Sequence, residues 1–141
     1  MLQKIHHPVL TNPFLWAACV PAIVLVAAHC LYAAGLVALP PDVGLQAFSY
    51  IGWIWYFTAL PLLWLINRSE FRKPYVVAAA VMPPFVVHVL FFMFGQLIPA
   101  EEEFERNTRI LQFCLTISLA MGAASAAIYL FMAHLKGKIL K

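Results

Sequence analysis

Two histidines, His29 and His88, are the side chains best placed for chemistry in this sequence. Each lies inside a long apolar segment, where a polar side chain is costly and normally faces a protein partner. If both segments are helices that start at the same membrane surface, the two rings differ in depth below that surface by about 3 Å, at a rise of about 1.5 Å per residue. Two neutral imidazoles on different helices can ligate one haem b. The sequence therefore predicts a bis-histidine site, with Gly52 or Gly122 making room for the porphyrin.

A structural role for the same two histidines is the competing interpretation. Each neutral ring would then form a hydrogen bond with Tyr56, with Ser118 or with a free main-chain carbonyl group. Against haem, no arginine lies inside the apolar segments to pair with its propionates. A proton relay through the two rings is a third interpretation, because imidazole titrates near neutral pH. A histidine in an apolar helix is more often a hydrogen-bonded core group than a ligand. On that ground the sequence favours a protein without a cofactor, and haem b is the alternative.

No other residues in the sequence form a recognisable catalytic or metal-binding pattern. Cys19, Cys30 and Cys114 stand alone in apolar segments, without the close pairing of a zinc or redox motif. Small buried cysteines of this kind usually act as apolar packing groups. The sequence also has no phosphate-binding loop, no metalloprotease or serine-hydrolase motif and no carboxylate pair inside an apolar segment. We therefore predict no catalytic residues, no metal site and no binding of nucleic acid.

Four apolar segments must position the histidines. Hydrophobic residues make up 64% of the 141 residues and charged residues only 11%, and the mean hydropathy is +0.86. A membrane-spanning helix needs roughly 20 apolar residues, and continuous apolar runs do not suit the alternating strands of a barrel. The sequence predicts one all-α integral membrane domain over residues 1–141, a four-helix transmembrane bundle. Its spans are expected at about 14–39, 45–66, 75–98 and 110–133.

The first of these segments is expected to be a retained span rather than a cleaved signal, because its apolar core is long and a second span follows at once.

The charges between the segments predict the topology. Basic residues gather before the first segment, between the second and third, and after the fourth, whereas the other two connections are neutral or mainly acidic. Cytoplasmic loops carry the excess of Lys and Arg, so both termini are expected in the cytoplasm of a bacterial-type inner membrane. The basic residues are Lys4, Arg68, Arg72, Lys73, Lys136, Lys138 and Lys141.

Prolines recur in the cytoplasmic half of three of the four segments. They are Pro21, Pro61, Pro83 and Pro84. Each proline removes a main-chain hydrogen bond and frees the carbonyl group four residues earlier, which for Pro84 is that of Ala80. In hydrocarbon such a carbonyl persists only where protein or a water-filled cavity satisfies it. We interpret the prolines as a layer that shapes an inner vestibule or hinge, and we favour an effect on shape over one on motion.

The sequence before the fourth segment predicts that its helix begins outside the membrane. Pro99 followed by carboxylates is typical of a helix start, since proline suits the first turn and negative charge suits the positive end of the helix dipole. The helix is expected to begin near Ala100 and to project about two turns from the membrane. Its acidic end is a candidate surface for a basic partner or a cation, or else a solvated extension. The acidic residues are Glu101, Glu102, Glu103 and Glu105.

Small residues line one face of the fourth segment. Ser118, Gly122 and Ala126 are spaced four residues apart, and such faces let helices approach closely in lipid. This face serves either packing within the bundle or association with another chain, and packing within the bundle is the default.

These features favour a function that depends on contact with another membrane protein. Its connections are short, it has few polar groups within the spans, and it offers small-residue and acidic surfaces. We predict an accessory subunit of a membrane complex, or an immunity-type protein that blocks a toxin. The alternatives are an electron-transfer subunit with haem b on His29 and His88, and an oligomeric channel whose inner mouth is the proline layer.

Overall fold

Four helices make up the structure, a computed structural model that describes residues 12–40, 43–68, 73–95 and 101–139. They are α1 (Pro13–Ala33), α2 (Gln46–Arg68), α3 (Lys73–Gly95) and α4 (Glu101–Ile139). The described residues contain no strand. Each helix is long and apolar enough to cross a membrane. The prediction of an all-helical chain with four candidate spans is confirmed.

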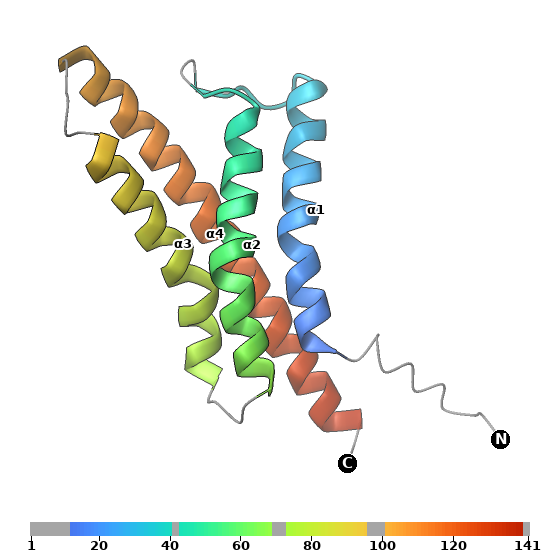
Figure 1. Ribbon diagram of the computed structural model, residues 1–141. Helices are drawn as coiled ribbons and strands as arrows, with labels where there is room; N and C mark the ends of the chain where they lie inside the picture. Colours follow the sequence, from blue (N-terminus) through green and yellow to red (C-terminus); the bar gives the residue numbers. More distant parts are fainter. Residues whose placement is uncertain (1–11, 41–42, 69–72, 96–100, 140–141) are drawn as a thin grey trace.

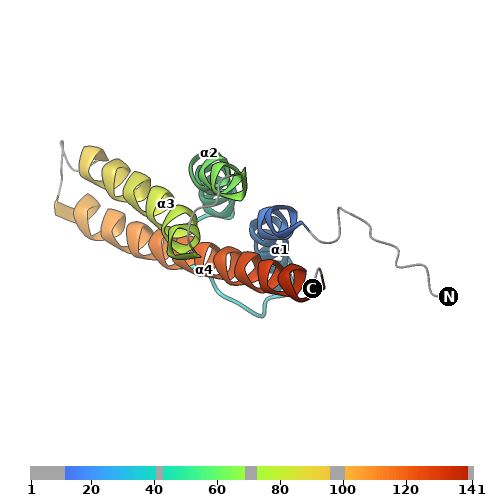
Figure 2. The ribbon, with the colours of Figure 1, turned by 90° about the horizontal axis from the view of Figure 1, so that it is seen from below.

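The helices form two antiparallel pairs that close at one end of the bundle and part at the other (Figure 1). At the end that holds the α2–α3 connection, called here the closed end, α4 lies beside α1. At the opposite end, called the split end, α3 and the start of α4 lean away from α1 and α2. Figure 2 shows the same arrangement from below. In the described part of the chain α1 and α3 do not pack against each other, because α2 and α4 lie between them.

The first helix ends earlier than the sequence predicts. Gly35 adopts the left-handed conformation with φ +69°, and its N–H donates to the Tyr32 carbonyl group at 2.9 Å. The N–H of Leu36 donates to the Leu31 carbonyl group at 3.0 Å. This pair of bonds is the glycine-terminated C-cap that stops many helices. The helix therefore stops at Ala33 rather than near residue 39.

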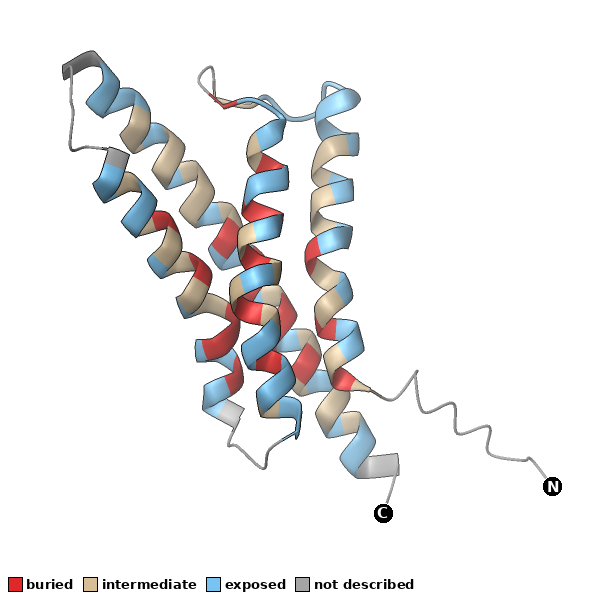
Figure 3. Ribbon diagram, viewed as in Figure 1, coloured by how far each residue is buried: buried red, intermediate tan, exposed pale blue. Residues whose placement is uncertain are grey.

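Buried residues lie on the sides of the helices that face one another (Figure 3). Many of the exposed side chains are large and apolar. The largest buried side chain is that of Trp55 in the middle of α2, which belongs to one buried cluster with Ile51, Leu63 and Met121. Large apolar side chains such as Phe57 and Phe91 are exposed. An apolar exterior of this extent suits hydrocarbon as solvent and would associate in water.

The double proline of α3 lies at the point where three helices meet. Pro84 has no N–H to offer the carbonyl group of Ala80, and the indole Nε1–H of Trp55 donates to that oxygen instead, at 3.0 Å. On the other side, a Cβ at Gly122 of α4 would come within 2.6 Å of the same oxygen. The absence of a side chain at Gly122 thus allows α4 to reach the main chain of α3. We call Trp55, Ala80, Pro84 and Gly122 the Ala80 junction.

Candidate functional site

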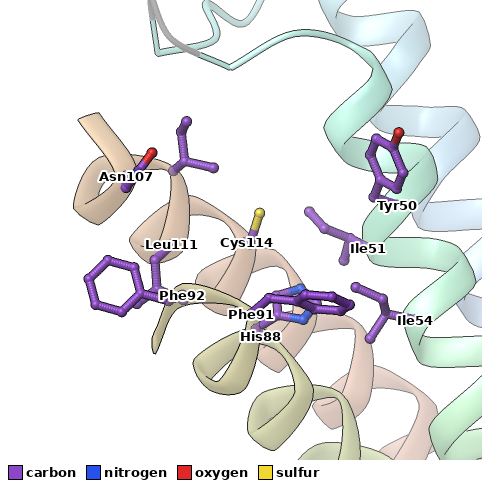
Figure 4. A pocket seen from close by; sticks show the side chains of 10 residues that line it. Tyr50, Ile51, Ile54, His88, Phe91, Phe92, Asn107, Leu111 and Cys114 are labelled. Atoms are coloured by element: carbon purple, nitrogen blue, oxygen red, sulfur yellow. The ribbon is translucent and has the colours of Figure 1, made fainter. Parts of the chain in front are cut away.

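A cleft opens between α2, α3 and α4 toward the split end of the bundle (Figure 4). Its volume is about 260 Å³. We call it the split-end cleft, because it opens toward that end of the bundle. Its lining residues are Tyr50, Ile51, Ile54, His88, Phe91, Phe92, Asn107, Ile110, Leu111 and Cys114.

The walls of this cleft are mostly aromatic and aliphatic. Tyr50 of α2 and Phe91 of α3 lie at its rim and are 67% and 66% exposed. Ile51 and Cys114 lie deeper and are more buried. Pockets that bind small molecules combine such apolar walls with a few polar groups that fix the orientation of the ligand.

The most buried polar side chain of the cleft is His88, which is only 6% exposed. Neither Nδ1 nor Nε2 has a hydrogen-bond partner among the residues that the structure describes. The Pro84 carbonyl group one turn earlier interacts with the ring but lies outside hydrogen-bond geometry, and it could serve only one of the two nitrogens. A buried polar group without a partner costs about 1–3 kcal/mol. His88 therefore has an unused capacity both to donate and to accept a hydrogen bond.

Two further polar groups lie along the cleft on α4. Asn107 lies at the outer end and the Cys114 thiol lies between Asn107 and His88 (Figure 4). Asn107 was not predicted as a site residue, since its place beside the cleft depends on how α3 and α4 lean. The amide can donate and accept hydrogen bonds, as a neutral imidazole can.

His29 has different surroundings from His88. Its Nδ1 donates to the Leu25 carbonyl group at 2.7 Å, and its ring packs on Phe48 with 5.4 Å between ring centroids. Phe48 in turn packs edge-on against Phe113 at 5.5 Å. His29 does not line the split-end cleft, and it lies on α1, which does not pack against α3 where both are described. The structure therefore gives each histidine its own environment, and a haem b held by both stays a prediction.

Both glycines expected to leave room for a porphyrin lie against protein atoms of a neighbouring helix. A Cβ at Gly52 would collide with the Leu25 side chain, and one at Gly122 with the Ala80 carbonyl group. These contacts give both glycines a role in helix packing.

The small-residue face of α4 lies inside the bundle. Ser118, Gly122 and Ala126 are all buried, and the contact of Gly122 with Ala80 brings this face against α3. The Ser118 hydroxyl has no hydrogen-bond partner within the described part of the chain. Packing within the bundle was the default expectation for this face, and its burial supports that expectation.

The acidic start of α4 is described in part. Glu103 and Glu105 are exposed, and Glu105 forms an ion pair with Arg109 one turn later at 3.8 Å. The side chains of Glu101 and Glu102 lie outside the described residues. An exposed pair of this kind contributes at most about 0.5 kcal/mol.

The prolines do not all face one space. Pro21 and Pro84 are buried, Pro83 is half-buried and Pro61 is exposed, and each lies inside a helix. The inner vestibule, and a channel built on it, stay predictions. Among the described residues no three of His, Cys, Asp and Glu come together as a metal site would require.

Comparisons with protein families, with curated proteins and with solved structures find no match for this chain.

Proposed function

We propose that the protein is a multi-pass protein of a bacterial-type inner membrane that works by contact with another membrane protein. In this proposal it is an accessory subunit of a membrane complex or an immunity-type protein. The observation that carries it is the face of α1 that points away from the bundle.

Small side chains recur along this outer face of α1. Its residues are exposed and recur at helical spacing, on the side opposite the buried Ala17 and Pro21. They are Cys19, Ala22, Val26, Cys30 and Ala33. We call this set the outer face of α1.

Small residues on an exposed face favour contact with another helix. In lipid no hydrophobic effect drives helices together, so association depends on close packing, which small side chains permit. Many exposed side chains of α2 and α3 are by contrast bulky, for example Trp53, Phe57, Phe91 and Phe94. The outer face of α1 thus suits a second transmembrane helix better than the bulky exposed side chains of α2 and α3 do.

The proposed topology puts the closed end in the cytoplasm. Arg68 ends α2 there, with its guanidinium 4.2 Å from the ring centroid of Trp64. An arginine above a tryptophan suits the headgroup level of a membrane, and positive charge favours the cytoplasmic side. The 39 residues of α4 would measure about 58 Å, more than a hydrocarbon core of about 30 Å, which supports an α4 that extends beyond the membrane.

Ala22→Phe tests the proposal, with Ala78→Phe as its matched control. Both alanines are exposed, but Ala78 lies on α3 away from the outer face of α1. Tagged protein is purified from membranes at native expression level, and the recovered membrane protein is quantified. We expect a stoichiometric partner with the wild type and with Ala78→Phe, and at least a tenfold lower recovery with Ala22→Phe. Equal recovery from both variants would refute a contact at this face.

Cys19 and Cys30 allow a second copy of the chain to be distinguished from a different partner. In a Cys114→Ala background, mild oxidation of membranes would join two copies through this face if they pack against each other. Replacing Cys19 and Cys30 as well would abolish the product. A partner that co-purifies without this covalent dimer is a different protein.

A further inference from the structure

We propose that the split-end cleft binds a lipid-soluble ring compound of the quinone or phenol class, held by a hydrogen bond with His88. The proposal concerns binding only and does not depend on a protein partner at α1. It rests on the imidazole, the walls of the cleft and the place where the cleft opens.

The imidazole requires a polar ligand. Both ring nitrogens of His88 lack a partner in the described structure, although the side chain is buried in an apolar region. Polar groups at such depth are normally paired. A neutral imidazole can donate to a carbonyl oxygen with one nitrogen and accept from a hydroxyl group with the other. An acyl chain has neither a carbonyl oxygen nor a hydroxyl group to offer, so it would leave both nitrogens of His88 without a hydrogen-bond partner.

The walls favour a flat ring over a chain. Phe91 and Phe92 of α3 and Tyr50 of α2 line the cleft, and aromatic side chains pack favourably against other rings. The volume of about 260 Å³ lies just below the range of pockets for whole drug-sized molecules. It suits a ring-sized head whose apolar tail remains in the lipid.

The polar groups of the cleft suit two oxygens on opposite sides of such a ring. His88 lies at the inner end and Asn107 at the outer end, with Cys114 between them (Figure 4). An amide can donate to the second carbonyl group while His88 serves the first. This pattern favours a para-quinone or its quinol over a phenol with a single oxygen.

The route to the cleft runs through the apolar surface. Tyr50 and Phe91 border the opening on the exterior of helices that are long and apolar enough to span a membrane. Phe91 is 66% exposed at the rim, and His88 lines the same cleft. A ligand dissolved in the lipid would enter sideways past the ring of Phe91.

The test measures binding of decylubiquinone to the full chain purified in detergent micelles, by equilibrium dialysis with correction for empty micelles. We expect saturable binding to the wild type and at least a tenfold weaker affinity for His88→Leu. His29→Leu is the matched control and should bind as the wild type does, because His29 does not line the cleft. Equal binding by the wild type and His88→Leu, or no saturable binding to either, would overturn the proposal.

A second variant and a competitor keep the result interpretable. Leu111→Trp fills the cleft and leaves His88 in place, so it should also abolish saturable binding. Dodecane should not displace decylubiquinone, and displacement would mean that the cleft holds an acyl chain instead. Circular dichroism of each variant verifies that it is folded. Ala22→Phe should bind decylubiquinone normally, which separates this proposal from the one for α1.

Discussion

The closed and split ends of the bundle are joined by different kinds of contact. Toward the closed end the Tyr56 hydroxyl donates to the Ala18 carbonyl group at 2.9 Å, and that of Tyr129 donates to Asn67 Oδ1 at 3.1 Å. Toward the split end the contacts between helices include a row of rings, His29, Phe48 and Phe113, and the His88 nitrogens stay unpaired in the described structure.

This difference teaches what holds helices together when lipid is the solvent. Hydrogen bonds between helices and small residues at their crossings drive association there, while bulky apolar side chains contact lipid as readily as protein. The bundle closes where tyrosine and tryptophan reach main-chain or amide oxygens and parts where they do not. Four substitutions test the comparison, from the largest expected effect to the smallest.

Trp55→Phe should have the largest effect. It removes the donor to the Ala80 carbonyl group, which costs about 1–3 kcal/mol for an unpaired buried acceptor, and it leaves a cavity besides. Unfolding by SDS in mixed micelles, followed by circular dichroism, measures the loss. In a Pro84→Ala background the new N–H can serve that carbonyl group, so Trp55→Phe should cost less there. An equal cost in both backgrounds would mean that the hydrogen bond contributes nothing.

Gly122→Ala should destabilise the bundle by about 1–3 kcal/mol, because the added Cβ meets the main chain of α3. Gly137→Ala is the control on the same helix, since a Cβ there has nothing within 4 Å. That change should be neutral or stabilising by up to about 1 kcal/mol, as alanine favours a helix. Equal unfolding free energies for both variants would contradict the close approach of α4 and α3.

Tyr129→Phe should reduce the unfolding free energy by about 0.5–1.5 kcal/mol through loss of the bond to Asn67. Tyr50→Phe at the rim of the split-end cleft removes a hydroxyl from a side chain that is largely exposed. Little change in stability is expected from it. A larger loss for Tyr50→Phe than for Tyr129→Phe would reverse the proposed contrast between the two ends.

Glu105→Gln should change the unfolding free energy by less than about 0.5 kcal/mol, because its pair with Arg109 is exposed. Added salt screens the ion pair, so it should reduce the difference in unfolding free energy between the wild type and Glu105→Gln. A loss above 1 kcal/mol would show that the start of α4 depends on charge more than its exposure implies.

The architecture was largely readable from the sequence, and the reasons are local. Continuous apolar runs free of charge predicted all four helices, and α4 begins at Glu101, next to the predicted start. The end of α1 was predicted too late because the apolar run continues to Leu39. Gly35 inside that run, with Pro40 and Pro41 five and six residues later, is also the pattern of a helix stop.

The candidate site was not readable, because it depends on the order and tilt of the helices. Depth along each helix put His29 and His88 at similar levels, but it could not show that α1 and α3 occupy opposite corners of the bundle. Nor could it show that Trp55 would serve the carbonyl group freed by Pro84. This hydrogen bond joins residues far apart in the chain, and the hydropathy of the sequence carries no information about which residues form it.

The Ala80 junction also determines how the helices stand relative to one another along the bundle axis. Apolar helices in lipid could slide past each other with little change in the surface they bury. At this junction one oxygen atom of α3 meets an indole of α2 from one side and a bare Cα of α4 from the other. Sliding α2 or α4 by even one turn, about 5.4 Å, would break the match. This one oxygen atom therefore helps to fix the axial position of three helices, and with it the level at which His88 faces the cleft.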